Sequence, residues 1–118
     1  MEIKEGMYVR TTDGIIEKVI KIGEIRYMHE ECYQTDRKET LYREDIKKAS
    51  FNIIDLIEVG DIVKWKTKYN GGINEVIDRF GEVGVYAIEE DCCNLLEDIE
   101  ILEVVTHEQF DSMKYEVK

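Results

Sequence analysis

The chain has 118 residues, of which 43% are hydrophobic and 36% charged, so it can form a hydrophobic core beneath a charged surface and is not expected to be disordered throughout. Its three cysteines cannot all pair within the chain, and its first residues lack the apolar stretch of a signal peptide. Together these features indicate a reducing, cytoplasmic environment. No apolar run approaches the ~20 residues of a membrane-spanning helix, so no membrane interaction is expected.

The first half of the sequence is predicted to consist of short strands. Residues 8–11 are rich in β-branched and aromatic side chains, and the Asp-Gly pair of Thr12-Asp13-Gly14 is typical of a hairpin turn into a return strand at residues 15–22. A third strand is expected near residues 25–28, after Gly23, and a fourth near residues 41–46. Helix is the competing interpretation of residues 15–22, but the adjacent turn signal favours a strand.

The second half repeats this pattern at an offset of about 54 residues. Glu5-Gly6-Met7-Tyr8-Val9 matches Val59-Gly60-Asp61-Ile62-Val63, and three looser matches follow in the same order, one of which aligns Cys32 with Cys92. The corresponding strands are expected at residues 62–69, 73–80, 85–88 and 99–105. The sequence therefore predicts a mainly β protein of two tandem SH3-like small barrels or sheets with a short C-terminal helix, divided into residues 1–50, 51–105 and 106–118.

The C-terminal helix is predicted over residues 106–113. Thr106-His107-Glu108-Gln109 forms a capping box, in which the side chains of Thr106 and Gln109 each bond to the other's backbone amide. Phe110 and Met113 share one face, and we expect them to dock the helix on the core. The apolar segment 50–57 joins the halves and is expected to be buried between them.

The net charge of −11 lies almost entirely in the second half. Residues 1–50 hold eleven acids and ten bases, whereas residues 51–118 hold sixteen acids and six bases. Between Phe80 and Met113 there are ten acids and no Lys or Arg. Such a field repels phosphate backbones and attracts basic surfaces, so direct nucleic-acid binding is disfavoured. A face that serves only solubility is the alternative that stays open.

Two motifs have the residue types of a metal site. His29-x-x-Cys32 with Cys92-Cys93 could supply zinc ligands, but neighbouring residues on a strand face opposite ways, and free Cys commonly packs as a small core residue. His107-Glu108-x-x-Asp111 resembles part of the zinc-hydrolase motif, with Asp in place of the second His. A solvated capping turn explains this second motif better than a metal site does. We therefore expect no metal and no cofactor, and we expect no enzymatic activity.

Two resemblances add context. The opening Gly-x-x-Val followed by a Gly-led hairpin resembles SH3-like barrels, including the KOW type, although this chain lacks the basic surface of KOW modules. Residues 51–61 (FNIIDLIEVGD) and 104–117 (VVTHEQFDSMKYEV), with Gly6-Met7-Tyr8-Val9-Arg10, are similar to small uncharacterised proteins of phages and prophages of low-GC Gram-positive bacteria. This second resemblance touches roughly a third of the chain and implies a phage accessory protein that acts in a bacterial cytoplasm. Proteins of that kind often disable host defence machinery.

Two hypotheses of function follow. The first is a non-enzymatic, anti-CRISPR-like inhibitor that engages a basic host protein, such as a CRISPR effector or nuclease, through acidic residues of the second half. The residues expected to make this contact are Glu82, Glu89, Glu90, Asp91, Glu97, Asp98 and Glu100. The alternative is a small-ligand binder that sequesters a signalling nucleotide between the halves or across a homo-oligomer interface. Its ligand would contact the basic and aromatic residues Lys64, Trp65, Lys66, Lys68 and Arg79.

Overall fold

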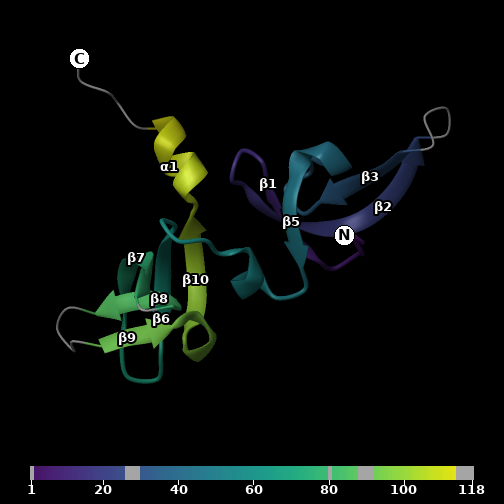
Figure 1. Cartoon of the computed structure of the whole chain (residues 1–118). Helices are drawn as coiled ribbons and strands as arrows, with labels where there is room; N and C mark the ends of the chain where they lie inside the picture. The colour runs from purple at the N-terminus through teal and green to yellow at the C-terminus, as the bar shows by residue number, and fades with distance from the viewer. Residues whose placement is uncertain (1, 26–29, 80, 88–91, 114–118) are drawn as a thin grey trace, which may run out of the picture. The chain divides into compact units, whose positions relative to one another are not determined.

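The chain forms two compact units, Met1–Leu56 and Ile57–Lys118 (Figure 1). The structure is a computed structural model that describes residues 2–25, 30–79, 81–87 and 92–113. The division falls six residues later than the boundary expected after Ser50, because the short 3-10 helix η2 (Ile53–Leu56) packs against strands of the first unit. The joining segment is not uniformly buried, since Phe51 is 60% exposed.

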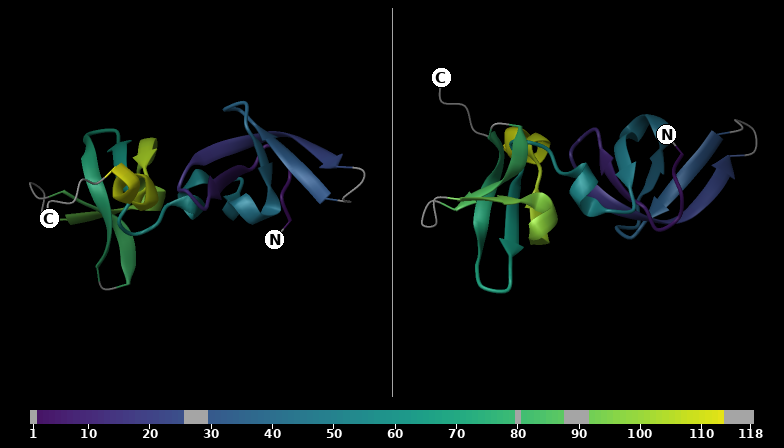
Figure 2. Two further views of the ribbon diagram at one scale, coloured as in Figure 1. Left: turned by 90° about the horizontal axis from the view of Figure 1, so that it is seen from above. Right: turned by 60° about the horizontal axis from the view of Figure 1, so that its bottom comes forward.

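The first unit is a five-stranded antiparallel sheet in the order β4-β3-β2-β1-β5. A 3-10 turn, η1 (Arg43–Asp45), separates the last two strands, and the final strand returns to pair with the first. The strands are β1 (Tyr8–Thr11), β2 (Ile16–Ile25), β3 (Glu30–Thr35), β4 (Thr40–Tyr42) and β5 (Ile46–Ser50). Strand β2 is long enough to pair with β1 through its first residues and with β3 through the rest, so it runs on with β3 away from β1 (Figure 2).

The second unit repeats this topology, with the sheet order β10-β6-β7-β8-β9. Its strands are β6 (Ile62–Lys66), β7 (Gly71–Arg79), β8 (Glu82–Ala87), β9 (Cys92–Leu95) and β10 (Glu100–Val105), with the 3-10 turn η3 (Leu96–Asp98) before the last of them. Helix α1 (His107–Met113) follows β10. The protein is therefore mainly β with two sheet units and a short C-terminal helix, as the sequence predicts, and its connectivity is compatible with an SH3-like arrangement.

The repeat extends to individual hydrogen bonds. Gly6 and Gly60, which are 54 residues apart, both have a positive φ, of 87° and 97°, a conformation that glycine adopts without steric cost. Their backbone N–H groups donate to the carbonyl oxygens of Val19, at 2.8 Å, and Val76, at 2.9 Å. Both valines are fully buried. The glycines matched in the two halves of the sequence thus begin the same turn in each unit.

Three details of the sequence prediction are wrong. Each sheet has five strands rather than the four expected. In the first unit, the strand expected at residues 41–46 is β4, η1 and the first residue of β5, and in the second unit β9 is an additional strand between those expected at residues 85–88 and 99–105. The third strand of the first unit is Glu30–Thr35, later than the expected residues 25–28, of which 26–28 lie outside the described residues. Cys32 lies in the third strand of its unit and Cys92 in the fourth strand of the other, so the two are not equivalent.

Each unit has its own core. In the first, Val9 and Val19 pack with Tyr33, Leu41 and Ile46. In the second, the buried residues are inward-facing strand residues, the first residue of η3 and the residue that follows η3: Val63, Trp65, Val76, Val85, Leu96 and Ile99. Among the described residues, no helix combines the length and the apolar character needed to cross a membrane.

Candidate functional site

The candidate acidic residues that the structure describes are all exposed. They are Glu82 at the start of β8, Glu97 and Asp98 on η3, and Glu100 at the start of β10. Because Gly84 pairs with Leu95 in the β8–β9 register, Glu82 lies at the same end of the sheet as η3. The other three candidates, Glu89, Glu90 and Asp91, lie outside the described residues.

Basic residues from neighbouring strands reach part of this acidic set. The Nζ atom of Lys66 lies 3.6 Å from Oε2 of Glu100, and Arg79 is directly opposite Glu82 in the β7–β8 register. The run between Phe80 and Met113 that lacks bases in sequence is therefore not free of bases in space. Glu97 and Asp98 make no ion pair with any residue in the described part of the chain, so η3 carries the uncompensated charge of the set.

The residues of the alternative ligand site do not converge on one face. Trp65 is 3% exposed, and its Nε1–H donates to Oδ1 of Asn74 at 2.9 Å. An indole buried and bonded in this way is a core residue and cannot stack on a ligand, which corrects its assignment to that site. Lys64 and Lys66 are on the opposite, exposed face of β6, as the alternation of the strand predicts. Lys68 lies beyond the strand, with its Nζ atom 5.5 Å from the centre of the Tyr69 ring.

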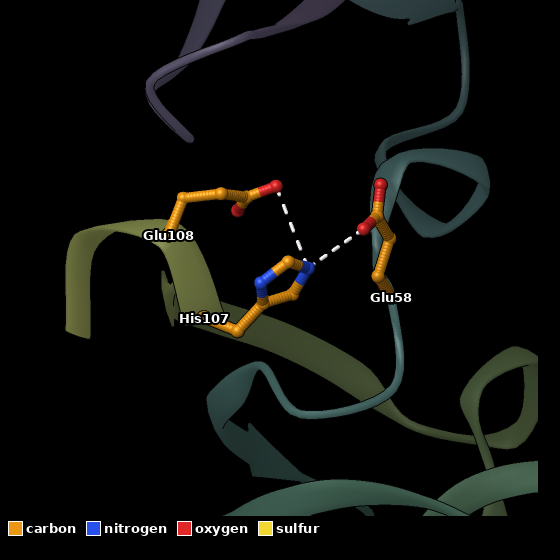
Figure 3. Close-up of side chains that lie close together, drawn as sticks. All are labelled: Glu58, His107 and Glu108. Carbon is orange, nitrogen blue, oxygen red and sulfur yellow. Dashed lines mark hydrogen bonds and ion pairs between the residues drawn. The ribbon is translucent and has the colours of Figure 1, made fainter. Parts of the chain in front are cut away.

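A cluster of a different kind joins the segment before β6 to the start of α1. The Nε2 atom of His107 lies 2.8 Å from Oε1 of Glu58 and 3.4 Å from Oε1 of Glu108 (Figure 3). One ligand atom from each of the three side chains lies within 4.8 Å of the others. The side chains are partly buried, with exposed fractions of 33% for His107, 16% for Glu58 and 18% for Glu108.

Buried Asp61 positions this Glu58–His107–Glu108 cluster. Its Oδ2 atom accepts the backbone N–H of Glu58 at 2.8 Å, and its Oδ1 atom accepts the backbone N–H of His107 at 2.9 Å. The capping box fixes the same end of α1, since Gln109 N–H donates to Thr106 Oγ1 at 3.3 Å and Thr106 N–H donates to Gln109 Oε1 at 3.1 Å. The backbones of two of the three residues are therefore held by hydrogen bonds that do not use the cluster side chains.

The sequence motif contains only part of this cluster. It includes His107 and Glu108 but pairs them with Asp111, which is exposed on α1 and is not among the grouped residues. Glu58 comes from 49 residues earlier in the chain, and no local pattern marks it. Of the other motif, Cys32 is a free thiol of intermediate exposure, whereas His29 and the side chains of Cys92 and Cys93 lie outside what the structure describes.

The first unit contains a buried carboxylate that the sequence does not single out. Glu17 is 2% exposed, and its Oε1 atom accepts the hydroxyl of Thr35 at 2.7 Å. Its Oε2 atom is buried and has no hydrogen-bond partner among the described residues. Glu17 also lines a cavity of about 250 Å³ together with Thr11, Asp13, Glu39 and Asp45.

A scan against protein-family models, a search of curated proteins and a search of solved structures each found no match to this chain.

Proposed function

We propose that this protein is a non-enzymatic binding protein whose second unit engages a basic surface of a partner protein. The observation that carries the proposal is the uneven charge of the two units. The second unit has fifteen acidic and six basic residues, a net charge of −9, whereas the first has twelve and ten, a net charge of −2. The exposed carboxylates of this unit include Glu97 and Asp98 on η3, which make no ion pair with any described residue.

The chemistry of this surface suits a protein that normally binds nucleic acid. A groove that attracts phosphates also attracts a set of carboxylates, and charge of this kind speeds association and selects the partner. Together with the resemblance to small phage proteins, this favours an anti-defence inhibitor of a host CRISPR effector or nuclease, acting in the bacterial cytoplasm. Direct nucleic-acid binding is not part of the proposal, because like charges repel.

A charge-reversal experiment tests the proposal. Tagged parent protein and the variant Glu97→Lys/Asp98→Lys are used to capture proteins from the lysate of a bacterium that carries a CRISPR system. The captured proteins are identified, and their affinities are measured at low and high salt. The parent is expected to retain a nucleic-acid-binding protein with an affinity that falls as salt rises. The double reversal is expected to weaken this affinity at least tenfold.

A matched control separates local contact from net charge. Glu2→Lys/Glu44→Lys changes two exposed acids of the first unit and alters the net charge by the same amount. This control is expected to bind like the parent. Equal capture by the parent and by Glu97→Lys/Asp98→Lys would contradict the proposal, as would equal weakening by the two double variants.

A further inference from the structure

We infer that the Glu58–His107–Glu108 cluster is a binding site for a divalent transition-metal ion such as Zn²⁺ (Figure 3). The donors would be Nε2 of His107 and one carboxylate oxygen from each glutamate. This site is separate from the acidic residues of η3, and the inference does not depend on the proposed function.

The distances in the cluster suit a shared ion. Two ligand atoms of a tetrahedral zinc ion, each bound at about 2.1 Å, lie ~3.4 Å apart. The Nε2 atom of His107 is already 3.4 Å from Oε1 of Glu108. It is 2.8 Å from Oε1 of Glu58, so that carboxylate would have to move away by roughly 0.6 Å. A shift of this size needs only a small side-chain rotation.

The supporting structure reduces the cost of binding. The ligands come from two segments that are far apart in sequence, and such segments must normally be ordered when a metal binds. Here the carboxylate of Asp61 already bonds to the backbone N–H groups of both Glu58 and His107. Gly60, between Glu58 and Asp61, has a φ of +97° and passes close to His107, so that a Cβ there would lie 3.5 Å from Cβ of His107.

The donor set selects the class of metal. One imidazole nitrogen with two carboxylate oxygens suits zinc and its first-row neighbours, whereas Ca²⁺ and Mg²⁺ prefer oxygen ligands alone. Three protein ligands leave a fourth position for water, as in open zinc sites. The side-chain exposures of 16% to 33% leave the cluster accessible to an ion from solvent.

The same contacts could instead be an ion pair between protonated His107 and its two carboxylates, and a zinc titration distinguishes the two. The full chain, free of any affinity tag, carries Cys32→Ser, Cys92→Ser and Cys93→Ser so that thiols cannot bind the ion. Zn²⁺ is titrated in competition with a chromophoric chelator. We expect one ion per chain, an increased melting temperature, and no such effect from Mg²⁺ at the same concentration.

Single substitutions identify the ligands. In the cysteine-free chain, Glu58→Gln, His107→Ala and Glu108→Gln are each expected to weaken zinc binding at least tenfold. Asp111→Asn, a change on the same helix but outside the cluster, is expected to leave it unchanged. Long-range ¹H–¹⁵N NMR of the imidazole rings should show zinc shifting Nε2 of His107 and leaving His29 unaffected. Trp65 fluorescence verifies that each variant remains folded in the second unit.

Three results would overturn the inference. The first is the absence of zinc binding by the folded, cysteine-free chain at millimolar zinc. The second is binding that survives both Glu58→Gln and His107→Ala in folded variants. The third is loss of binding in Asp111→Asn while Glu58→Gln binds normally, which would assign the ion to the linear sequence motif instead.

Discussion

The backbone N–H of His107 donates a 2.9 Å hydrogen bond to Oδ1 of Asp61, a residue 46 positions earlier in the chain. The other oxygen of the same carboxylate accepts the N–H of Glu58 at 2.8 Å, and the Asp61 side chain is fully buried. Hydrogen bonds to ionised acceptors are roughly twice as strong as those between neutral groups. One carboxylate therefore connects the segment before β6 to the first turn of α1.

Replacing this carboxylate should destabilise the second unit. A hydrogen bond to a charged group contributes about 1.5–3 kcal/mol, so Asp61→Ala, which removes at least these two, is expected to lower the free energy of unfolding by about 3 kcal/mol or more. Trp65 is the single tryptophan of the chain and is buried in this unit, so its fluorescence in urea follows this unit's unfolding. Asp111→Ala, at an exposed position of α1, should change stability by less than about 0.5 kcal/mol. Equal midpoints for the two variants would show that the Asp61 bonds add nothing.

Phe110 should contribute little to stability. The sequence predicts that Phe110 docks α1 on the core. Its side chain is 53% exposed, so that prediction is wrong for Phe110. The side chain of Met113, the other predicted docking residue, lies outside what the structure describes. Phe110→Ala is therefore expected to cost less than about 1 kcal/mol, whereas Leu96→Ala, at a position 7% exposed, should cost about 2–5 kcal/mol. Urea titration monitored by Trp65 fluorescence compares them. If Phe110→Ala lowers the free energy of unfolding about as much as Leu96→Ala does, Phe110 docks α1 on the core after all.

The features that the sequence predicts correctly depend on neighbouring residues. The capping box of Thr106 and Gln109 spans four positions, and the strand at Tyr8–Thr11 is bounded by its own Asp-Gly turn. The glycines that open each unit can be matched because a positive φ restricts the residue type. In each case the residues that determine the structure are within a few positions of one another, so a local sequence pattern predicts it.

The features that the sequence misses depend on distant contacts. The first turn of α1 is held by the hydrogen bond from His107 N–H to Asp61, which spans 46 residues. Glu58 joins His107 across a similar distance, so no helical or strand spacing brings the two together. The run without bases at residues 80–113 does not include Lys66 and Arg79, which only the strand register places beside Glu100 and Glu82.

Thr35 should stabilise the first unit by bonding to buried Glu17. Its hydroxyl donates to Oε1 of Glu17 at 2.7 Å, and the two side chains are 0% and 2% exposed. Thr35→Val keeps the shape but leaves the carboxylate without this donor, so we expect a loss of about 1.5–3 kcal/mol. In Thr35→Val/Glu17→Leu no charge is left unpaired, and the losses of the two single variants should not add.

The first unit lacks tryptophan, so hydrogen exchange of the Val19 amide, which bonds to Met7 O at 2.8 Å, measures this effect. The Trp65 transition of the second unit serves as an internal control and should not move. Additive losses in the double variant would mean that the bond between Thr35 and Glu17 has no coupling energy.

Tyr33 should make the first unit sensitive to alkaline pH. Burial raises the pKa of its hydroxyl above the usual 10.0, and the hydrogen bond that it donates to Oε2 of Glu31, at 3.0 Å, acts in the same direction. Because the folded state holds this proton more tightly than the unfolded state, the protonated hydroxyl of Tyr33 stabilises the folded state, and this stabilisation is fully present below pH 10. This stabilisation is lost as the pH rises from 10 through the folded-state pKa of Tyr33.

Spectrophotometric titration should show one tyrosine that ionises after the others, and this late ionisation should be absent in Tyr33→Phe. The stability lost by the parent between pH 8 and about 11 should exceed that lost by Tyr33→Phe. Tyr69→Phe, at a position 83% exposed, should behave like the parent, and equal alkaline losses in the parent and Tyr33→Phe would assign the effect to other groups.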